Sequence, residues 1–330
     1  MMKHRFWIGT YSANGGEGLI SATIDEAGRI EIEGAESRIV DASYGLWCAD
    51  LQTAWFVCEQ EAGQVSGWRL ENDRWVPLGS VSTGGAAPCF LDISPDHSLL
   101  AVANYESGSV ATIVLDAATG APLHRSGFLQ NSGKGPDPDR QAGPHVHCAR
   151  FADKGGTLYF TDLGLDRVFA ASVDSGGELQ DKRVMFCAPP GFGPRHLVAL
   201  ADEVMVNGEL SSGLVALAKT DGTFIPMDSL RTDPSNKPGN LGGHLLVEDE
   251  LIWTSNRGAD TLVAFRVMQG ALHQVACFPS GGQSPRHLAR VNKHLVAAHE
   301  KDGTVSSIDA SVGNVLCDVI VPGAAFLMSA

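Results

Sequence analysis

The sequence predicts an all-β fold, a seven-bladed β-propeller made of four-stranded antiparallel blades. The first observation is a repeated pentapeptide: Gly193-Pro-Arg-His-Leu197 returns as Ser284-Pro-Arg-His-Leu288, with the two arginines 91 residues apart. The second is the pattern that comes after each copy, a short apolar run, a polar corner, and two more β-rich runs joined by a Gly-containing turn. Repeats of about 40–50 residues with roughly four short strands each are typical of propeller blades.

Seven β-rich runs mark the second strand of each repeat. Their last residues are Thr10, Glu59, Asn104, Asp162, Asn207, Asn256 and His299. Six of them are followed by a turn and a third strand, at residues 63–70, 108–116, 166–174, 213–220, 261–267 and 304–309. The ends recur every 43 to 58 residues along the chain, and this nearly constant period predicts seven blades.

The two ends of the chain are expected to complete one blade together. The first repeat begins at its second strand, whereas residues 322–328 have the pattern of a first strand with no strand after it. The C-terminal strand would then be innermost, and this closure would remove exposed sheet edges. Residues 1–330 are therefore expected to form a single propeller domain.

Composition excludes several classes of protein. A formal charge of −14 makes nucleic acid and anionic membranes improbable partners, because both require a basic surface. No basic segment precedes an apolar stretch near the N-terminus, and no run of about 18 apolar residues occurs, so we expect a cytoplasmic protein with no membrane partner. Seven cysteines without a Cys-x-x-Cys spacing indicate reduced thiols rather than disulfides or a zinc site.

The longest insertion precedes the fourth blade and ends in two histidines. Residues 131–147 are rich in Gly and Pro, which indicates a loop, and they finish with His145-Val-His147. Residues two apart on an extended strand point the same way, so both imidazoles can face one channel. The alternative is a pair of structural histidines, and this interpretation remains open.

Other polar residues lie where propellers usually bind ligands, on first strands or just after second strands. Arg195 and Arg286 hold equivalent positions two blades apart, and each is followed by a histidine. Glu209 and Arg257 come after the second strands of the fifth and sixth blades. Each could serve a ligand, or it could pair with a neighbour or cap a turn. Capping is the expected role of Asp162 and Asp166. No nucleotide-binding or nucleophilic-serine motif is present.

Taken together, these motifs resemble the lactonase family of seven-bladed propellers. That family includes 6-phosphogluconolactonases and the fungal-type 3-carboxy-cis,cis-muconate cyclases. The segments that carry the resemblance span the chain: Ile8-Gly-Thr-Tyr11, Ser94-Pro-Asp96, Val102-Ala-Asn-Tyr105, residues 140–147, residues 161–168, Gly193-Pro-Arg-His196, Asn207 to Leu210 and Ser255-Asn-Arg-Gly258.

The resemblance implies a lactone hydrolase of carbohydrate metabolism, similar to the 6-phosphogluconolactonases of the pentose phosphate pathway. It implies a catalytic cluster of His147, Glu209, Arg195 and Arg257, and no metal or other cofactor. His145, His196, Asn256, His244 and Arg286 are the expected substrate-binding residues. An imidazole, with an ordinary pKa of about 6.5, suits proton transfer near neutral pH, and guanidinium groups suit a developing oxyanion or an anionic substituent. Whether His145 or His147 is the base remains open.

Three alternatives keep a propeller but change the function. A carboxymuconate-cyclising or lactone-opening isomerase would use the same acid and cations. A six-bladed, metal-dependent sugar lactonase would need a Glu-Asn-Asp type of metal site. A non-catalytic scaffold would bind a protein. Such scaffolds carry a Trp-Asp or paired-Gly signature in most blades, but here no Trp-Asp pair occurs and the Gly-Gly pairs do not recur at one position in most blades. The expected partner is a small anionic lactone, and the chain is expected to be a monomer or a homodimer.

Overall fold

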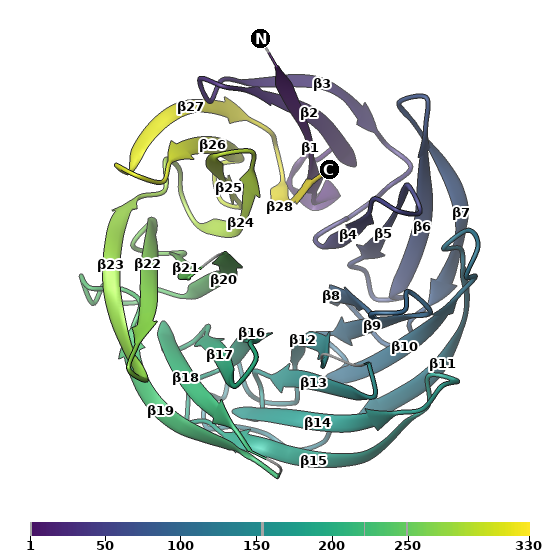
Figure 1. Ribbon diagram of the computed structural model, residues 1–330, viewed down its shortest axis with the longest axis vertical. Helices are drawn as coiled ribbons and strands as arrows, with labels where there is room; N and C mark the ends of the chain where they lie inside the picture. Colours follow the sequence, from purple (N-terminus) through teal and green to yellow (C-terminus); the bar gives the residue numbers. More distant parts are fainter. Residues whose placement is uncertain (1, 153–154, 221, 249) are drawn as a thin grey trace. The chain divides into compact units, whose positions relative to one another are not determined.

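The computed structural model describes residues 2–152, 155–220, 222–248 and 250–330 (Figure 1). Over these ranges the chain forms seven four-stranded antiparallel sheets, the blades of a seven-bladed β-propeller, together with a short 3₁₀ turn, η1 (Ser12–Asn14). This confirms the predicted fold class, and the blade count contradicts a six-bladed propeller.

Two compact units make up the chain: Met1–Ser43 with Leu210–Ala216 and Met227–Ala330, and Tyr44–Glu209 with Leu217–Pro226. The first unit holds three blades. They are β28 (Ala324–Ser329), β1 (Lys3–Thr10), β2 (Leu19–Asp25) and β3 (Ile30–Glu36); β20 (Gly242–Glu248), β21 (Leu251–Asn256), β22 (Thr261–Met268) and β23 (Ala271–Pro279); and β24 (Pro285–Val291), β25 (His294–His299), β26 (Thr304–Asp309) and β27 (Asn314–Ile320).

The second unit also holds three complete blades. They are β4 (Gly45–Cys48), β5 (Thr53–Cys58), β6 (Gln64–Glu71) and β7 (Arg74–Ser82); β8 (Pro88–Ile93), β9 (Leu99–Asn104), β10 (Ser109–Leu115) and β11 (Pro122–Gln130); and β12 (Val146–Phe151), β13 (Thr157–Asp162), β14 (Arg167–Val173) and β15 (Leu179–Cys187). The last blade begins in this unit with β16 (Pro194–Ala199) and β17 (Glu203–Gly208), and its other strands are β18 (Gly213–Lys219) and β19 (Phe224–Arg231).

The seven predicted second strands correspond to β1, β5, β9, β13, β17, β21 and β25. The predicted closure by the chain ends is also confirmed, because β28 pairs antiparallel with β1, with Leu327 opposite Ile8. None of the seven cysteines, all of which lie in the described ranges, forms a disulfide.

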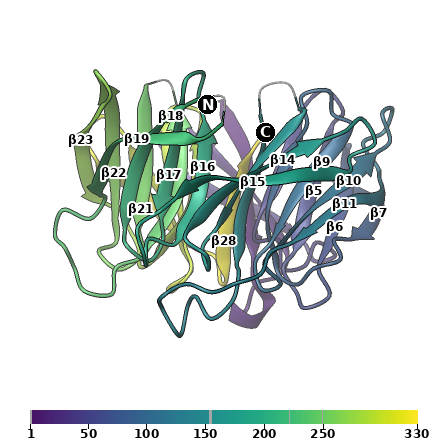
Figure 2. The same cartoon turned by 90° about the horizontal axis from the view of Figure 1, so that it is seen from below.

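Burial decreases from the second strand of a blade to the fourth. All six residues of β9 are buried, whereas β23, the fourth strand of its blade, has a single buried residue, Leu272, among exposed and partly buried ones. A strand that is covered on both faces reads as a continuous apolar run, which is why the second strands were the ones visible in the sequence. Figure 2 shows β21, β22 and β23 of the first unit in this order.

A β-bulge recurs at the start of the first strand in six blades. In β16, Pro194 pairs with Gly208 and Leu197 with Val206, so Arg195 and His196 together face only Asn207. In the other five blades the first strand likewise has one residue more than the strand it pairs with. The residues concerned are Cys89 in β8, His147 in β12, Gly243-His244 in β20, Arg286 in β24 and Ala325 in β28. Bulges redirect side chains and are frequent next to active sites.

Candidate active site

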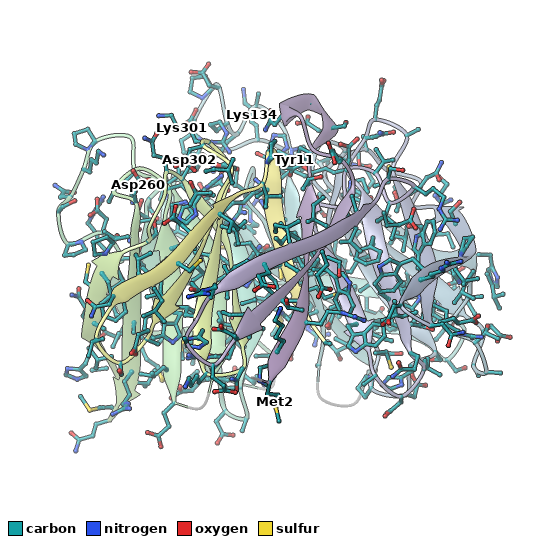
Figure 3. All side chains as sticks on the ribbon, turned by 90° about the horizontal axis from the view of Figure 1, so that it is seen from above. Met2, Tyr11, Lys134, Asp260, Lys301 and Asp302 are labelled. Carbon is teal, nitrogen blue, oxygen red and sulfur yellow. The ribbon has the colours of Figure 1, made fainter. Side chains whose placement is uncertain are left out.

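A repeated backbone hydrogen bond brings the residue after the second strand close to the bulge. In β16 and β17, the amide of Glu209 donates to the carbonyl of Gly193 at 2.7 Å, two residues before Arg195. The same bond joins Tyr105 to Ala87, Leu163 to His145, Arg257 to Leu241, Glu300 to Ser284 and Tyr11 to Gly323. Figure 3 shows that Tyr11, Asp260, Lys301 and Asp302 of the first unit lie at one end of it, opposite Met2. Each of these blades therefore places a bulge residue close to a loop residue.

In the second unit these two kinds of position bring three predicted catalytic residues into contact. Arg195 Nη1 lies 2.5 Å from both Glu209 Oε2 and His147 Nε2. Glu209 Oε2 is 3.8 Å from the same imidazole nitrogen. The three side chains are only 3–5% exposed. The blade of β12 supplies the imidazole, and the blade of β16 supplies the ion pair.

The contact with Arg195 defines the resting state of His147. A guanidinium carries only hydrogen-bond donors and stays charged in proteins, so Nε2 must be the acceptor, with its lone pair directed at Arg195. The ring proton of the neutral imidazole is then on Nδ1, which lies 3.7 Å from Cys89 Sγ. This places the basic nitrogen on the side of the ring that faces Arg195 and Glu209.

Two more residues complete this cluster. Arg140 Nη2 donates to Glu209 Oε1 at 2.5 Å and to the Tyr105 hydroxyl at 3.2 Å. Burial alone would lower the pKa of Arg140, but the Glu209 carboxylate and the Tyr105 hydroxyl outweigh it and raise the pKa, so the guanidinium remains charged. Burial raises the pKa of Tyr105 above its ordinary value, against the opposing Arg140 contact, so its hydroxyl stays neutral. Glu209 thus accepts from a guanidinium on each oxygen.

Hydrogen bonds at both ends tie down the loop that carries Arg140. Asp162 Oδ2 accepts from Asn131 Nδ2 at 2.6 Å, and its Oδ1 accepts from the backbone amide of His145 at 2.9 Å. Between them, Gln141 Nε2 donates to the carbonyl of Leu163 at 2.8 Å. Asp162 therefore has the expected capping role, and burial raises the pKa of its carboxyl. The loop is ordered by these bonds.

Asp166 fixes the backbone segment that leads into Arg195. Its carboxylate accepts from the backbone amides of Gly191 at 2.7 Å and Gly193 at 2.8 Å. We expect Asp166→Ala to lower the free energy of unfolding by about 1–3 kcal/mol and to lower kcat about tenfold to hundredfold, because a small displacement of Arg195 disturbs the cluster. Denaturant unfolding and steady-state kinetics measure the two effects.

Asp260→Ala is the matched control. Asp260 Oδ1 accepts from the amide of Ser284 at 2.7 Å, two residues before Arg286. Asp260→Ala should lower the free energy of unfolding about as much as Asp166→Ala does, but should lower kcat less. An equal fall in kcat for both variants would contradict the positioning role of Asp166.

The first unit contains a similar arrangement around Glu300. Glu300 Oε2 accepts from Arg286 Nη1 and Oε1 from Arg257 Nη1, both at 3.2 Å, and the Arg286 guanidinium lies 5.3 Å from the Tyr11 ring centroid. Arg286 and Glu300 are 14 residues apart, as are Arg195 and Glu209. Two predicted site residues, Arg257 and Arg286, are therefore together in this unit. Their predicted roles stay predictions.

Of the remaining predicted residues, the three histidines pack against other aromatic rings and Asn256 is held by hydrogen bonds. His145 stacks on Tyr105 with ring centroids 4.5 Å apart, and His196 packs edge-on against His147 at 5.5 Å. His244 lies against His287 in the first unit, with ring centroids 3.9 Å apart. Asn256 is fully buried, and its amide bonds to Thr232, Asn240 and Thr261. A ligand contact by Asn256 would have to break one of these bonds.

Sequence reasoning missed three residues of these clusters, Tyr105, Glu300 and Arg140. The first two come directly after second strands, the same repeat position that singled out Glu209 and Arg257, so extending the comparison to all blades would have found them. Arg140 lies in the insertion, where no repeat position applies.

Two further observations concern the rest of the described chain. No group of three or more His, Cys, Asp or Glu side chains within it is arranged to hold a metal ion. No helix in the described ranges has the length and apolarity needed to cross a membrane.

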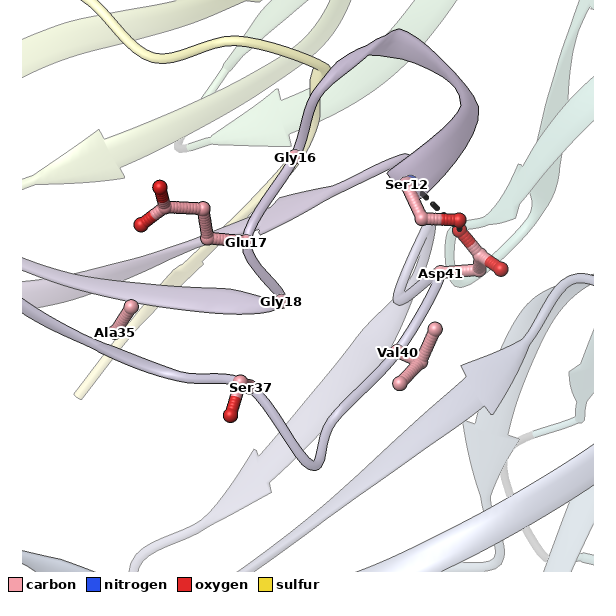
Figure 4. Close-up of a pocket in the computed structure, with 8 residues that line it drawn as sticks. All are labelled: Ser12, Gly16, Glu17, Gly18, Ala35, Ser37, Val40 and Asp41. Carbon is pink, nitrogen blue, oxygen red and sulfur yellow. Dashed lines mark hydrogen bonds between the residues drawn. The ribbon is translucent and has the colours of Figure 1, made fainter.

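A surface pocket in the first unit is lined by residues that include Ser12, Glu17, Ser37 and Asp41 (Figure 4), and Ser12 Oγ donates to Asp41 Oδ1 at 2.7 Å. None of the predicted site residues lines it.

Comparisons with known proteins agree with this fold. Residues 5–315 match the family described as lactonase, 7-bladed β-propeller. A 6-phosphogluconolactonase of Bacillus subtilis is 26% identical over 92% of this chain and 90% of its own length. An uncharacterised protein of Staphylococcus aureus is likewise 26% identical, over 94% of this chain and 95% of its own length.

Solved structures give the same result. A protein from Lactobacillus plantarum superposes with a TM-score of 0.91 and 25% identity, over the whole of both chains. The periplasmic gluconolactonase of Pseudomonas aeruginosa superposes with a TM-score of 0.87 over 99% of both chains, at 24% identity, and so supports the fold alone. With a family match over nearly its whole length, the chain belongs to the lactonase family of seven-bladed β-propellers.

Proposed function

We propose that the protein hydrolyses a sugar-derived lactone without a metal ion, and that 6-phosphogluconolactone is the first substrate to test. The observation that carries this proposal is the buried contact of His147 with Arg195 and Glu209. Lactone hydrolysis requires a base for water, a cation or donor for the tetrahedral oxyanion, and a proton for the departing alkoxide. Membership of the lactonase family and the B. subtilis relative support the same reaction.

In the proposed mechanism His147 is the general base and then the general acid. When the bound lactone displaces the contact between Arg195 and Nε2, the Nε2 lone pair accepts a proton from water as the water oxygen bonds to the lactone carbonyl carbon. Glu209, 3.8 Å away, stabilises the imidazolium that forms. When the carbonyl double bond re-forms and the ring C–O bond breaks, the imidazolium returns the proton to the departing ring oxygen. The products are a free hydroxyl and a carboxylic acid.

Arg195 supplies the positive charge for the tetrahedral intermediate. Its guanidinium is 3% exposed and already held by Glu209, so it does not need to reorganise when negative charge develops on the carbonyl oxygen. Preorganised donors of this kind are usually the largest single contribution to such reactions. Arg257 belongs to the other unit, and its predicted catalytic role stays a prediction.

The test is hydrolysis of 6-phosphogluconolactone and of glucono-1,5-lactone by the wild-type protein in excess EDTA, followed by proton release and corrected for the spontaneous rate. We expect hydrolysis well above that of the heat-denatured control and unchanged by the chelator. No acceleration with any sugar lactone would contradict the proposed function, and loss of activity in EDTA would contradict metal independence. Consumption of a carboxymuconate, seen as loss of its ultraviolet absorbance, would favour the isomerase alternative.

The proposed compartment and assembly rest on the sequence alone. The P. aeruginosa gluconolactonase is periplasmic, so the cytoplasmic location of this protein stays a prediction. That the chain is a monomer or a homodimer likewise stays a prediction.

A further inference from the structure

Three partly exposed side chains, Arg140, Tyr105 and His145, form an outer layer beside the buried cluster. They form a continuous set, since Arg140 donates to the Tyr105 hydroxyl and the Tyr105 ring stacks on His145. The Tyr105 ring also contacts His147 edge-on at 5.3 Å. Arg140 is 35% exposed, whereas Arg195 is 3% exposed. The outer layer therefore faces solvent at one side and His147 and Glu209 at the other.

Arg140 keeps most of its hydrogen-bonding capacity. A guanidinium has five N–H donors arranged to match an oxyanion. Among the described residues, the side-chain bonds of Arg140 all come from Nη2, to Glu209 and to Tyr105, and none comes from Nη1 or Nε. One edge of this guanidinium can thus bind an oxyanion while the other stays with Glu209.

Tyr105 and His145 are oriented so that they can help Arg140 bind an oxyanion. The Tyr105 hydroxyl accepts from Arg140, so its own hydrogen can be donated to another oxygen. His145 Nδ1 lies 3.0 Å from the carbonyl oxygen of Tyr105. Because a carbonyl oxygen only accepts, His145 is the donor, and this bond fixes its ring against the Tyr105 ring.

We propose that Arg140 and Tyr105, with His145 stacked beside them, form an oxyanion subsite that binds the phosphate or carboxylate of the substrate, next to the reacting centre. This proposal rests on the proposed function and adds the residues that select anionic lactones. A local cation is needed because the protein carries a formal charge of −14, which repels anions overall. Arg195 is less suited to this role, because its Nη1 already contacts both His147 and Glu209.

The test compares a phosphorylated with a neutral lactone. For Arg140→Met we expect KM for 6-phosphogluconolactone to rise about 10-fold to 100-fold, the usual loss for a hydrogen bond to a charged group. KM for glucono-1,5-lactone should change less than about threefold, and any fall in kcat that comes from losing the Arg140 bond to Glu209 should be the same for both lactones. Tyr105→Phe should show the same selectivity with a smaller rise in KM.

Arg167→Met is the matched control. Arg167 is an exposed arginine of the same unit, and no side-chain hydrogen bond or ion pair to it is found among the described residues. It should leave both substrates unaffected. Equal rises in KM on both lactones for Arg140→Met would overturn the subsite and indicate that Arg140 only positions Glu209. No change in KM on either lactone would overturn it as well.

Equilibrium binding separates the subsite from the proposed function. Titration calorimetry with 6-phosphogluconate, and with a carboxylated muconolactone, is carried out on wild type and on Arg140→Met. Binding that depends on Arg140 supports the subsite even if neither sugar lactone is hydrolysed. Dependence on Arg140 for 6-phosphogluconate alone indicates that the subsite binds phosphate, and dependence for the muconolactone as well indicates that it binds carboxylate. Affinity that is equal in the two proteins, or absent in both, would overturn the subsite.

Discussion

Replacing His147 by alanine is expected to lower kcat for lactone hydrolysis by about 10²–10⁴, the usual contribution of a positioned general acid–base. The imidazole is 5% exposed, and its Nε2 is directed at Arg195 and Glu209. KM should change little, because His147 acts on the proton and not on the rest of the substrate. Steady-state kinetics with 6-phosphogluconolactone measure both constants.

His145→Ala is the natural control, because His145 is two residues away and contacts the same tyrosine. We expect it to raise KM and to keep kcat within about fivefold of wild type. Thermal unfolding of both variants shows whether the fold is retained. If His145→Ala loses kcat and His147→Ala does not, the assignment of the base to His147 is wrong.

Replacing Arg195 by methionine is expected to damage both stability and catalysis. The change leaves the carboxylate of Glu209, 4% exposed, with Arg140 as the remaining member of this cluster that donates to it. Removing one member of a buried ion pair typically costs about 3–5 kcal/mol of stability. Loss of the oxyanion donor should lower kcat about 10²–10³-fold. Denaturant unfolding and kinetics at saturating substrate measure the two effects.

The double variant Arg195→Met with Glu209→Met tests the cause of the instability. Because it removes the buried carboxylate together with its partner, stability should recover in part while activity does not. Arg286→Met is the matched control: it breaks the equivalent pair with Glu300, whose side chain is 25% exposed, so its cost should be smaller. A double variant no more stable than the single one would contradict this explanation.

The sequence predicted the blades well because the second strands are buried on both faces. Runs such as residues 99–104, 157–162 and 251–256 coincide with β9, β13 and β21. Within the site, the contact between Arg195 and Glu209 was also foreseeable, since the equivalent pair Arg286 and Glu300 has the same spacing along the chain.

Two aspects of the site could not be read from the sequence. The bulges depend on how two strands pair, and an alternating apolar pattern does not show that one strand carries an extra residue. Arg140 belongs to an insertion, and its approach to Glu209 depends on the hydrogen bonds of Asp162 and Gln141 that shape the loop.

The recurrent bulge has a consequence for how such a protein can change its chemistry. Each bulge adds one residue that the strand pairing does not require, so point substitutions there can exchange one side chain for another while the ladder of hydrogen bonds is kept. The bulge positions of the six blades already hold Cys89, His147, Arg195, Gly243, Arg286 and Ala325. Gly243 is constrained, because a Cβ there would lie 2.3 Å from Ser255 Oγ. Ala325 is enclosed as well, with 1% of its surface exposed, so such exchanges are expected at the four bulge positions that already hold Cys, His or Arg.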